Sequence, residues 1–219
     1  MLLRHLQNLL GGIYGIDVPE DVNDFLVTDQ AAVEYLAGMK SEHDVDEKLL
    51  IVQNEDSLDV ALYLDKEVLV RLSSADPRRH LHRQNLGDFW TVLEGVSHFN
   101  YLAWNASLDK PVTLMELEMQ AEVDKYVGTR LMLQEQTGEV VAHRIIEQLF
   151  EETYFYAHLS EQELERYRSA SSFASRYCYN LENRFPRDRV ASDMMQELRA
   201  FYRLPQPGKV SHIQSAQLA

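Results

Sequence analysis

The fold of this chain is decided by residues 86–105, which read LGDFWTVLEGVSHFNYLAWN. A helix drawn over this stretch carries apolar side chains on nearly every face. Such a helix has no face suited to water and is buried inside a protein. We therefore expect residues 86–105 to form a central buried helix, on which the other elements pack.

The chain beyond this helix predicts more helices. Thr113 and Glu116 have the spacing of a capping box, as do Ser160 and Glu163. After Ser160, seven residues alternate at spacings of three and four, which is typical of a helix–helix seam. They are Leu164, Tyr167, Ser171, Ala174, Cys178, Leu181 and Phe185. The small residues in the middle of this seam favour close packing on a neighbouring helix, with Cys178 as a buried, inert thiol.

The chain before residue 86 contains patterns of strands. Residues 49–52 are a short apolar run, and residues 58–65 alternate apolar with polar or small side chains. A second alternation follows over residues 67–72. Period-two alternation is typical of strands with one buried face, so residues 49–72 predict a three-stranded antiparallel meander. The predicted fold class is α+β and helix-dominated, with this small sheet packed against a bundle of four to five helices.

The same patterns predict a single globular domain over residues 1–204. It comprises an acidic helical region at 1–48, the meander at 49–72 and the helical bundle at 86–204. Pro205 and Pro207 are expected to end the last helix, because proline cannot donate the backbone hydrogen bond that a helix needs. Residues 205–219 are therefore predicted to be a flexible tail.

Composition excludes several classes of protein. The chain has 219 residues, 45% of them hydrophobic, which argues against global disorder. A net charge of −14 argues against nucleic-acid binding by the whole molecule, because phosphate is repelled. No apolar run approaches the roughly 20 residues needed to cross a membrane, and a single cysteine rules out a disulfide framework. With no signal-peptide pattern at the N-terminus, the prediction is a cytoplasmic protein.

Charge is unevenly distributed along the chain. Residues 1–67 carry a net charge of −11, whereas residues 166–219 carry +5. The arginines of the C-terminal quarter could pair with the acidic N-terminal region, bind an acidic protein partner, or grip nucleic acid. The candidate partner-binding residues from this region and from the basic cluster near residue 80 are Arg176, Arg184, Arg187, Arg189, Arg78 and Arg79.

Motifs of common enzyme classes are absent from the sequence. The main candidate for a catalytic or metal site is therefore one group of acidic and histidine side chains. Glu94 and His98 are four residues apart and share a face of the central helix; Glu118 and Glu122 repeat the spacing on the next. These four residues are candidate ligands for iron, manganese or zinc, and Glu94 and His98 are also candidates for metal-free acid–base catalysis. The alternative is a structural polar pair or a partner contact, because the spacing departs from the Glu-x-x-His of di-iron bundles. His143 and Glu147 have the same spacing on a solvated face.

Three functional hypotheses follow. The first is a non-enzymatic interaction or regulatory protein that engages a protein partner or assembles with itself and needs no cofactor; charge segregation favours it. The second is a metal-dependent helical-bundle enzyme that uses the carboxylate–histidine constellation. The third is an acidic mimic of nucleic acid, in which the acids of residues 17–67 form one exposed stripe.

Overall fold

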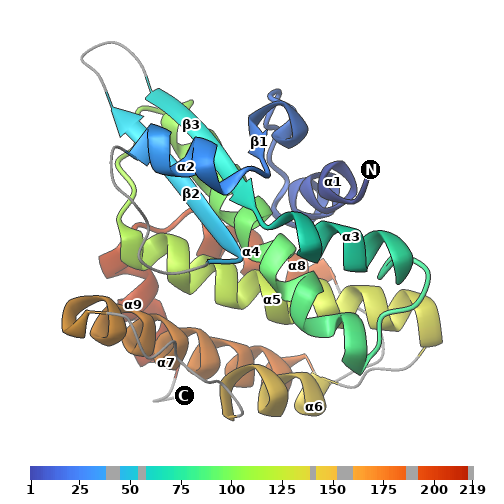
Figure 1. Cartoon of the computed structure of the whole chain (residues 1–219). Coiled ribbons are helices and arrows are strands. Elements are labelled where there is room, and N and C mark those ends of the chain that lie inside the picture. Colours follow the sequence, from blue (N-terminus) through green and yellow to red (C-terminus); the bar gives the residue numbers. More distant parts are fainter. Residues whose placement is uncertain (38–44, 54–57, 139–141, 152–159, 186–191, 217–219) are drawn as a thin grey trace.

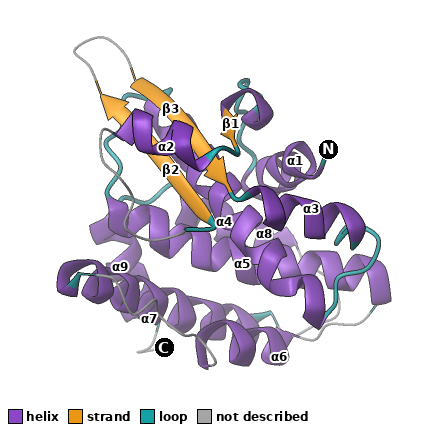
Figure 2. Cartoon of the chain, viewed as in Figure 1, coloured by secondary structure: helices purple, strands orange, loops and turns teal. Residues whose placement is uncertain are grey.

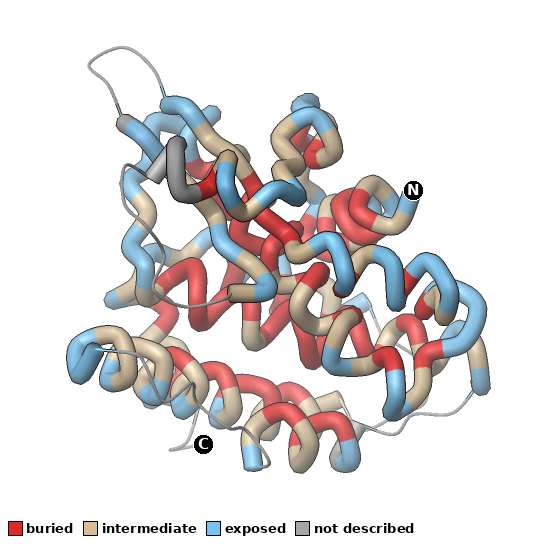
Figure 3. The backbone as a smooth tube through the Cα atoms, viewed as in Figure 1, coloured by how far each residue is buried: buried red, intermediate tan, exposed pale blue. Residues whose placement is uncertain are grey.

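The structure is a computed structural model that describes residues 1–37, 45–53, 58–138, 142–151, 160–185 and 192–216. Its layers are a small sheet, a central pair of long helices and an outer layer of helices (Figure 1). Helix is the dominant secondary structure, as predicted (Figure 2). Buried residues concentrate in the central helices, between the sheet and the outer layer (Figure 3).

The predicted central helix is confirmed as α4, Arg83–Ala106. The side chains of Phe89, Val92 and Leu93 have no exposed surface. Helix α4 contacts the sheet on one side and α5, Leu114–Thr137, on another. Gly128 of α5 lets the two helices approach closely, since a Cβ atom there would lie 3.0 Å from Leu93 Cδ2. An apolar helix is therefore covered from several directions, as its composition requires.

The sheet is smaller and less regular than predicted. Strands β2, Glu47–Gln53, and β3, Leu58–Leu64, pair antiparallel as expected. The third strand is β1, Leu26–Val27, which pairs parallel with β3 and gives the order β1-β3-β2. The sheet is therefore mixed, and the prediction of a wholly antiparallel sheet is only partly right.

The prediction of a strand over residues 67–72 is wrong, because this segment is helix α3, Lys66–Ser74. Asp65 caps the helix by accepting hydrogen bonds from the backbone amides of Glu67 and Val68. Val68 and Leu72, four residues apart, are buried, whereas Val70 is 47% exposed. The apolar residues fit a helical period as well as a strand period, and the cap at Asp65 favours the helix.

Both predicted capping boxes are confirmed, at the starts of α5 and of α7, Glu161–Arg184. Helix α7 packs along α5, so the neighbour predicted for its seam is part of the same chain. Ala174, Cys178 and Leu181 of the seam are buried. Burial raises the pKa of the Cys178 thiol well above its usual value, which agrees with an inert residue.

The remaining elements surround this core. Helix α1, Leu2–Tyr14, packs on α4 and on α8, Ser192–Tyr202. A 3₁₀ helix, Val22–Phe25, precedes β1, and α2, Gln30–Ala37, contacts β1 and β2. Helix α6, Ala142–Ile146, continues into a π-helical segment, Glu147–Glu151. No helix in the described ranges is long and apolar enough to cross a membrane.

The prediction of a flexible tail is wrong for residues 206–215, which form helix α9, Gln206–Ser215. Pro205 and Pro207 stand at its start, where the missing amide hydrogens cost nothing. Ile213 of this helix is buried, and Lys209 of the same helix is fully buried. The Lys209 ammonium donates to Gln120 Oε1 at 2.7 Å and to the Phe201 carbonyl at 3.1 Å.

Helix α9 is thereby joined to a buried polar network at the centre of the molecule. Asp124 of α5 accepts hydrogen bonds from Ser97 of α4 at 2.6 Å and from the hydroxyl of Tyr14 of α1. Gln120 donates to the same carboxylate at 2.9 Å and accepts from Lys209. Burial raises the pKa of Asp124 to about 6 and lowers the pKa of Lys209 to about 7. The network links α1, α4, α5 and α9, and the hydrogen bond from Lys209 to the Phe201 carbonyl adds α8.

Several C-terminal arginines are used within the chain. Arg199 and Arg203 donate to the carbonyls of residues 12–15 at the end of α1, and Arg199 lies against Gly15. Gly15 has φ +60°, the left-handed conformation that ends many helices. The partners of these two arginines are therefore helix-end carbonyls rather than the acidic side chains considered from sequence.

The candidate partner-binding arginines have different environments. Arg184 pairs with Glu197 at 2.9 Å, and Arg78 pairs with Asp76 at 2.7 Å. Arg176 and Arg79 are exposed. Arg187 and Arg189 lie outside the described residues.

Candidate functional site

The residues singled out on the two central helices do meet in space, at the edge of the sheet. Helix α4 contributes Glu94 and His98, and α5 contributes Glu118, Glu122 and Lys125. Glu47, the first residue of β2, reaches the same place from the sheet. We refer to these six residues as the carboxylate cluster. Each has a side chain at most 22% exposed, so the cluster is largely withdrawn from water.

His98 lies at the centre of the carboxylate cluster. Its Nδ1 is 3.4 Å from Glu47 Oε1, and its Nε2 is 3.9 Å from Glu118 Oε2. The second distance is too long for a hydrogen bond, and Nε2 has no partner within the described residues. A buried polar atom without a partner is costly, so it indicates a missing ligand or a contact completed by a small shift of the ring.

Lys125 is the internal cation of the cluster. Its ammonium lies 2.6 Å from Glu94 Oε2 and 2.8 Å from Glu122 Oε1. The cluster has four carboxylates and one ammonium, so with every carboxylate ionised its charge is negative even when His98 is protonated. An excess of buried charge of one sign is unfavourable unless a proton or a cation is bound.

Glu47 reaches the cluster because residue 95 is a glycine. A Cβ atom at Gly95 would lie 2.8 Å from Leu62 Cδ1, 3.0 Å from Glu47 Cγ and 3.2 Å from Glu47 Oε1. Any larger residue would displace the Glu47 side chain. Gly95 follows Glu94 directly, so one helical turn supplies Glu94, His98 and the space for Glu47.

The pKa values reflect this crowding of charge. Burial alone would lower the pKa of His98, but Glu47, Glu118 and Glu94 raise it to about 9. Burial raises the pKa of Glu118 to about 7 and also raises the pKa values of Glu47 and Glu122. Lys125 outweighs burial at Glu94 and lowers its pKa. Without another cation, the cluster therefore holds extra protons at neutral pH.

These shifts predict how stability depends on pH in the metal-free protein. His98 has a folded pKa above its unfolded value of 6.5, so its contribution is complete below about pH 6.5 and is lost as pH rises through 9. We expect the stability difference between the wild type and His98→Gln to shrink over this range, by up to about 1.4 kcal/mol per pH unit. Urea unfolding with chelator present, followed by tryptophan fluorescence, measures it.

The exposed His5 provides the matched control, because it has no pair in the cluster. His5→Gln should leave the dependence of stability on pH as it is in the wild type. A difference between wild type and His98→Gln that stays constant from pH 6.5 to 9 would contradict the charge assignment.

Three residues of the cluster offer ligand atoms close enough to share one ion. One atom each from Glu47, Glu94 and His98 lies within 4.8 Å of the other two. Coordination at His98 Nδ1 would leave Nε2–H facing Glu118, which matches the carboxylate–histidine–metal arrangement common in proteins. Lys125 would hold Glu94, and Glu122 would hold Lys125. The cluster thus contains candidate ligands and groups to orient them.

All four metal-ligand candidates from the sequence are thus close together in the fold. Glu94 and His98 lie on α4, Glu118 lies 3.9 Å from His98 Nε2, and Glu122 is joined to Glu94 through Lys125. Sequence reasoning missed Lys125, although its position three residues after Glu122 was visible. It also missed Glu47, which no spacing pattern connects to the helices. The other pair considered, His143 and Glu147, is not part of the cluster's described contacts, and the His143 side chain lies outside the described residues.

Comparisons with family models, with curated proteins and with solved structures found no match to this chain. The chemical interpretation therefore rests on the residues and their geometry.

Proposed function

We propose that this chain is a metal-dependent enzyme that holds one divalent transition-metal ion between Glu47, Glu94 and His98. The observation that carries the proposal is the position of His98, whose two ring nitrogens face carboxylates from two different elements. One of those nitrogens is buried without a partner in the described part of the chain. Four carboxylates surround it, against the single ammonium of Lys125. A divalent ion would replace protons that the cluster otherwise holds.

Each residue has a distinct role in this proposal. Glu47, Glu94 and His98 supply ligand atoms, and Glu118 orients the imidazole. Lys125 neutralises the oxygen of Glu94 that faces it, which leaves the other carboxylate oxygen for the ion. Three protein ligands leave at least one coordination position for water or substrate, as in catalytic metal sites. A bound ion would act there as a Lewis acid.

The ligand types narrow the choice of metal. Carboxylate and imidazole ligands suit zinc, manganese and iron(II), whereas the absence of thiolate from the cluster disfavours copper(I). The Glu-x-x-x-His spacing of Glu94 and His98 differs from the Glu-x-x-His of paired-iron bundles. Together with one histidine in the cluster, this supports a site for a single ion.

Equilibrium dialysis of the chelator-treated protein against zinc, manganese or iron(II) tests the proposal. We expect about one equivalent of at least one of these metals to bind in the micromolar range or tighter. His98→Gln should weaken binding by roughly 100-fold or more, because it removes a ligand and breaks the contact between the helices and Glu47. Glu47→Gln should weaken binding by roughly 10-fold or more.

The exposed His5 again supplies the control, and His5→Gln should bind like the wild type. Absence of saturable binding for all three metals would overturn the proposal, as would equal affinities of the wild type and His98→Gln. Circular dichroism of each variant distinguishes loss of a ligand from loss of the fold.

An interaction protein without catalytic activity is the second candidate function. In its favour, β2 lies at an edge of the sheet and carries exposed apolar side chains at Ile51 and Val52, with Leu58 exposed on β3. Edge strands of this kind pair with other chains. A strictly monomeric mass in light scattering at micromolar concentration would count against self-assembly. The nucleic-acid mimic stays a prediction.

A further inference from the structure

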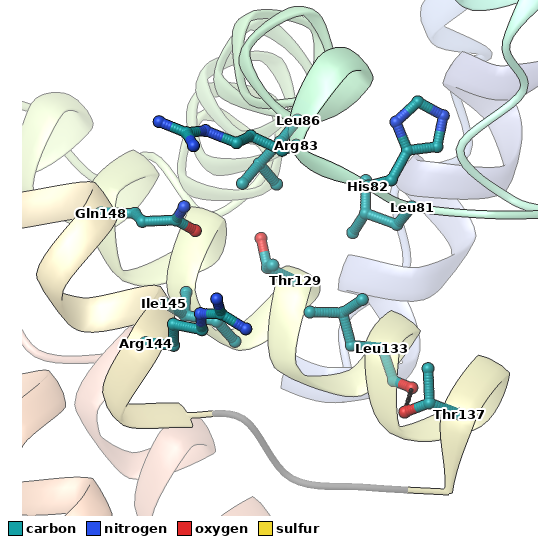
Figure 4. Close-up of a pocket in the computed structure, with 10 residues that line it drawn as sticks. All are labelled: Leu81, His82, Arg83, Leu86, Thr129, Leu133, Thr137, Arg144, Ile145 and Gln148. Carbon is teal, nitrogen blue, oxygen red and sulfur yellow. Dashed lines mark hydrogen bonds between the residues drawn. The ribbon is translucent and has the colours of Figure 1, made fainter.

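A cavity separate from the carboxylate cluster opens between three helices. It has a volume of about 320 Å³, within the range of small-molecule sites. Its described lining comes from α4 and the residues just before it, from α5, and from α6 and the π-helical segment. Figure 4 shows the side chains of Arg83, Gln148 and Arg144 around the cavity, with Thr129 and Leu133 of α5 facing the same space.

The lower part of the cavity is apolar. Leu81, Leu86, Leu133 and Ile145 contribute aliphatic side chains, and Leu81 and Ile145 are almost fully buried. Thr129 is occupied by its own neighbours, since its hydroxyl accepts from Trp90 Nε1 at 2.9 Å and donates to the Lys125 carbonyl at 2.6 Å. The surface available to a ligand here is therefore aliphatic, and it favours a hydrocarbon chain.

The rim of the cavity is positively charged. Arg83 and Arg144 are exposed and come from different helices, and neither forms an ion pair within the described residues. No aspartate or glutamate is found in the described lining, although the chain carries 35 acidic residues and a net charge of −14. Most other arginines already described are paired with carboxylates or carbonyls. Two unpaired guanidinium groups at one opening form a complementary site for an anion.

We propose that this cavity binds a small aliphatic carboxylate, with the carboxylate between Arg83 and Arg144 and the chain against the four aliphatic residues. Arginine is suited to this role, because its planar fork donates two parallel hydrogen bonds to a carboxylate. Gln148 adds a side-chain amide to the same lining. The site does not depend on the proposed metal centre, since none of its lining residues belongs to the carboxylate cluster.

Calorimetric titration with octanoate tests this site, with inorganic phosphate, 1-octanol and octylamine as comparison ligands. We expect octanoate to bind with a dissociation constant on the order of 0.1–1 mM, as its size permits. Octanol can contact only the aliphatic residues, and phosphate can contact only the two arginines. Each should therefore bind at least about 10-fold more weakly than octanoate. Octylamine should not bind, because its charge is repelled.

Variants locate the site and separate it from the metal centre. Arg83→Gln and Arg144→Gln should each weaken octanoate binding by about 10-fold, since each removes a charge-assisted contact. Arg79→Gln alters a nearby exposed arginine that does not line the cavity, and His98→Gln alters the carboxylate cluster. Both should bind octanoate like the wild type.

The proposal is overturned if octanoate does not bind, if octanol binds as tightly, or if an Arg83→Gln/Arg144→Gln double variant keeps the wild-type affinity. Both arginines are exposed, so their replacement is expected to leave the thermal unfolding temperature unchanged. Methyl NMR of the leucines and isoleucines, recorded in the same titration, should show shifts at Leu133 and Ile145.

Discussion

Replacement of Lys125 by methionine is expected to lower the free energy of unfolding of the metal-free protein by about 3–5 kcal/mol. Lys125 forms close ion pairs with Glu94 and Glu122, and its side chain is 11% exposed. Methionine keeps the apolar stem but leaves two buried carboxylates without their cation. Urea unfolding at neutral pH in the presence of a chelator measures the loss.

The Lys125→Met/Glu122→Gln double variant should lose less stability than Lys125→Met, because one of the unpaired carboxylates is gone. Lys66→Met is the matched control: Lys66 is exposed at the start of α3, and its replacement should change stability by less than about 0.5 kcal/mol. A loss below about 1 kcal/mol for Lys125→Met would show that the carboxylates are not held as charged groups.

Removal of residues 206–219 is expected to destabilise the protein by about 3–5 kcal/mol or more, contrary to what a flexible tail would give. Ile213 is buried, and removal of one buried aliphatic side chain alone costs about 2–5 kcal/mol. The truncation also removes Lys209, which donates to Gln120 and packs 4.2 Å from the ring centroid of Phe201. Thermal and urea unfolding of the truncated chain measure the effect.

Replacement of Gln214, an exposed residue of α9, by alanine is the control for this truncation, and it should leave stability within about 0.5 kcal/mol of the wild type. A chain without residues 206–219 that unfolds at the wild-type temperature would contradict the packing of α9 described above.

Parts of the fold could be predicted from the sequence where local residue patterns determine the structure. Residues 86–105 could be placed at the centre because their composition leaves no face for water. The capping boxes at Thr113 and Ser160 could be located because capping depends on side chains three residues apart. Residues 66–74 could not be assigned correctly from apolar periodicity, since Val68 and Leu72 suit either a strand or a helix. Helix α9 was missed because its stability comes from Ile213 and Lys209, whose partners are distant in sequence.

The carboxylate cluster, too, could be predicted only in the part that depends on local spacing. Pairs with helical spacing placed Glu94 beside His98 and Glu118 beside Glu122, and packing of α4 on α5 brought the pairs together. The presence of Glu47 in the cluster could not be predicted, because this residue lies at the start of a strand and its side chain needs the space left by Gly95. The role of Lys125 required knowledge of which face of α5 turns toward α4. Tertiary contacts of this kind are not encoded in local spacing.

Crystals of the protein grown with manganese or zinc, measured at wavelengths on either side of the absorption edge of that metal, test whether the carboxylate cluster binds a metal ion. We expect one anomalous peak in the carboxylate cluster, about 2.0–2.2 Å from a nitrogen of His98 and from oxygens of Glu47 and Glu94. The Lys125 ammonium should remain beside Glu94. A cluster without an anomalous peak, in crystals where the metal binds only surface residues, would contradict the proposed metal site.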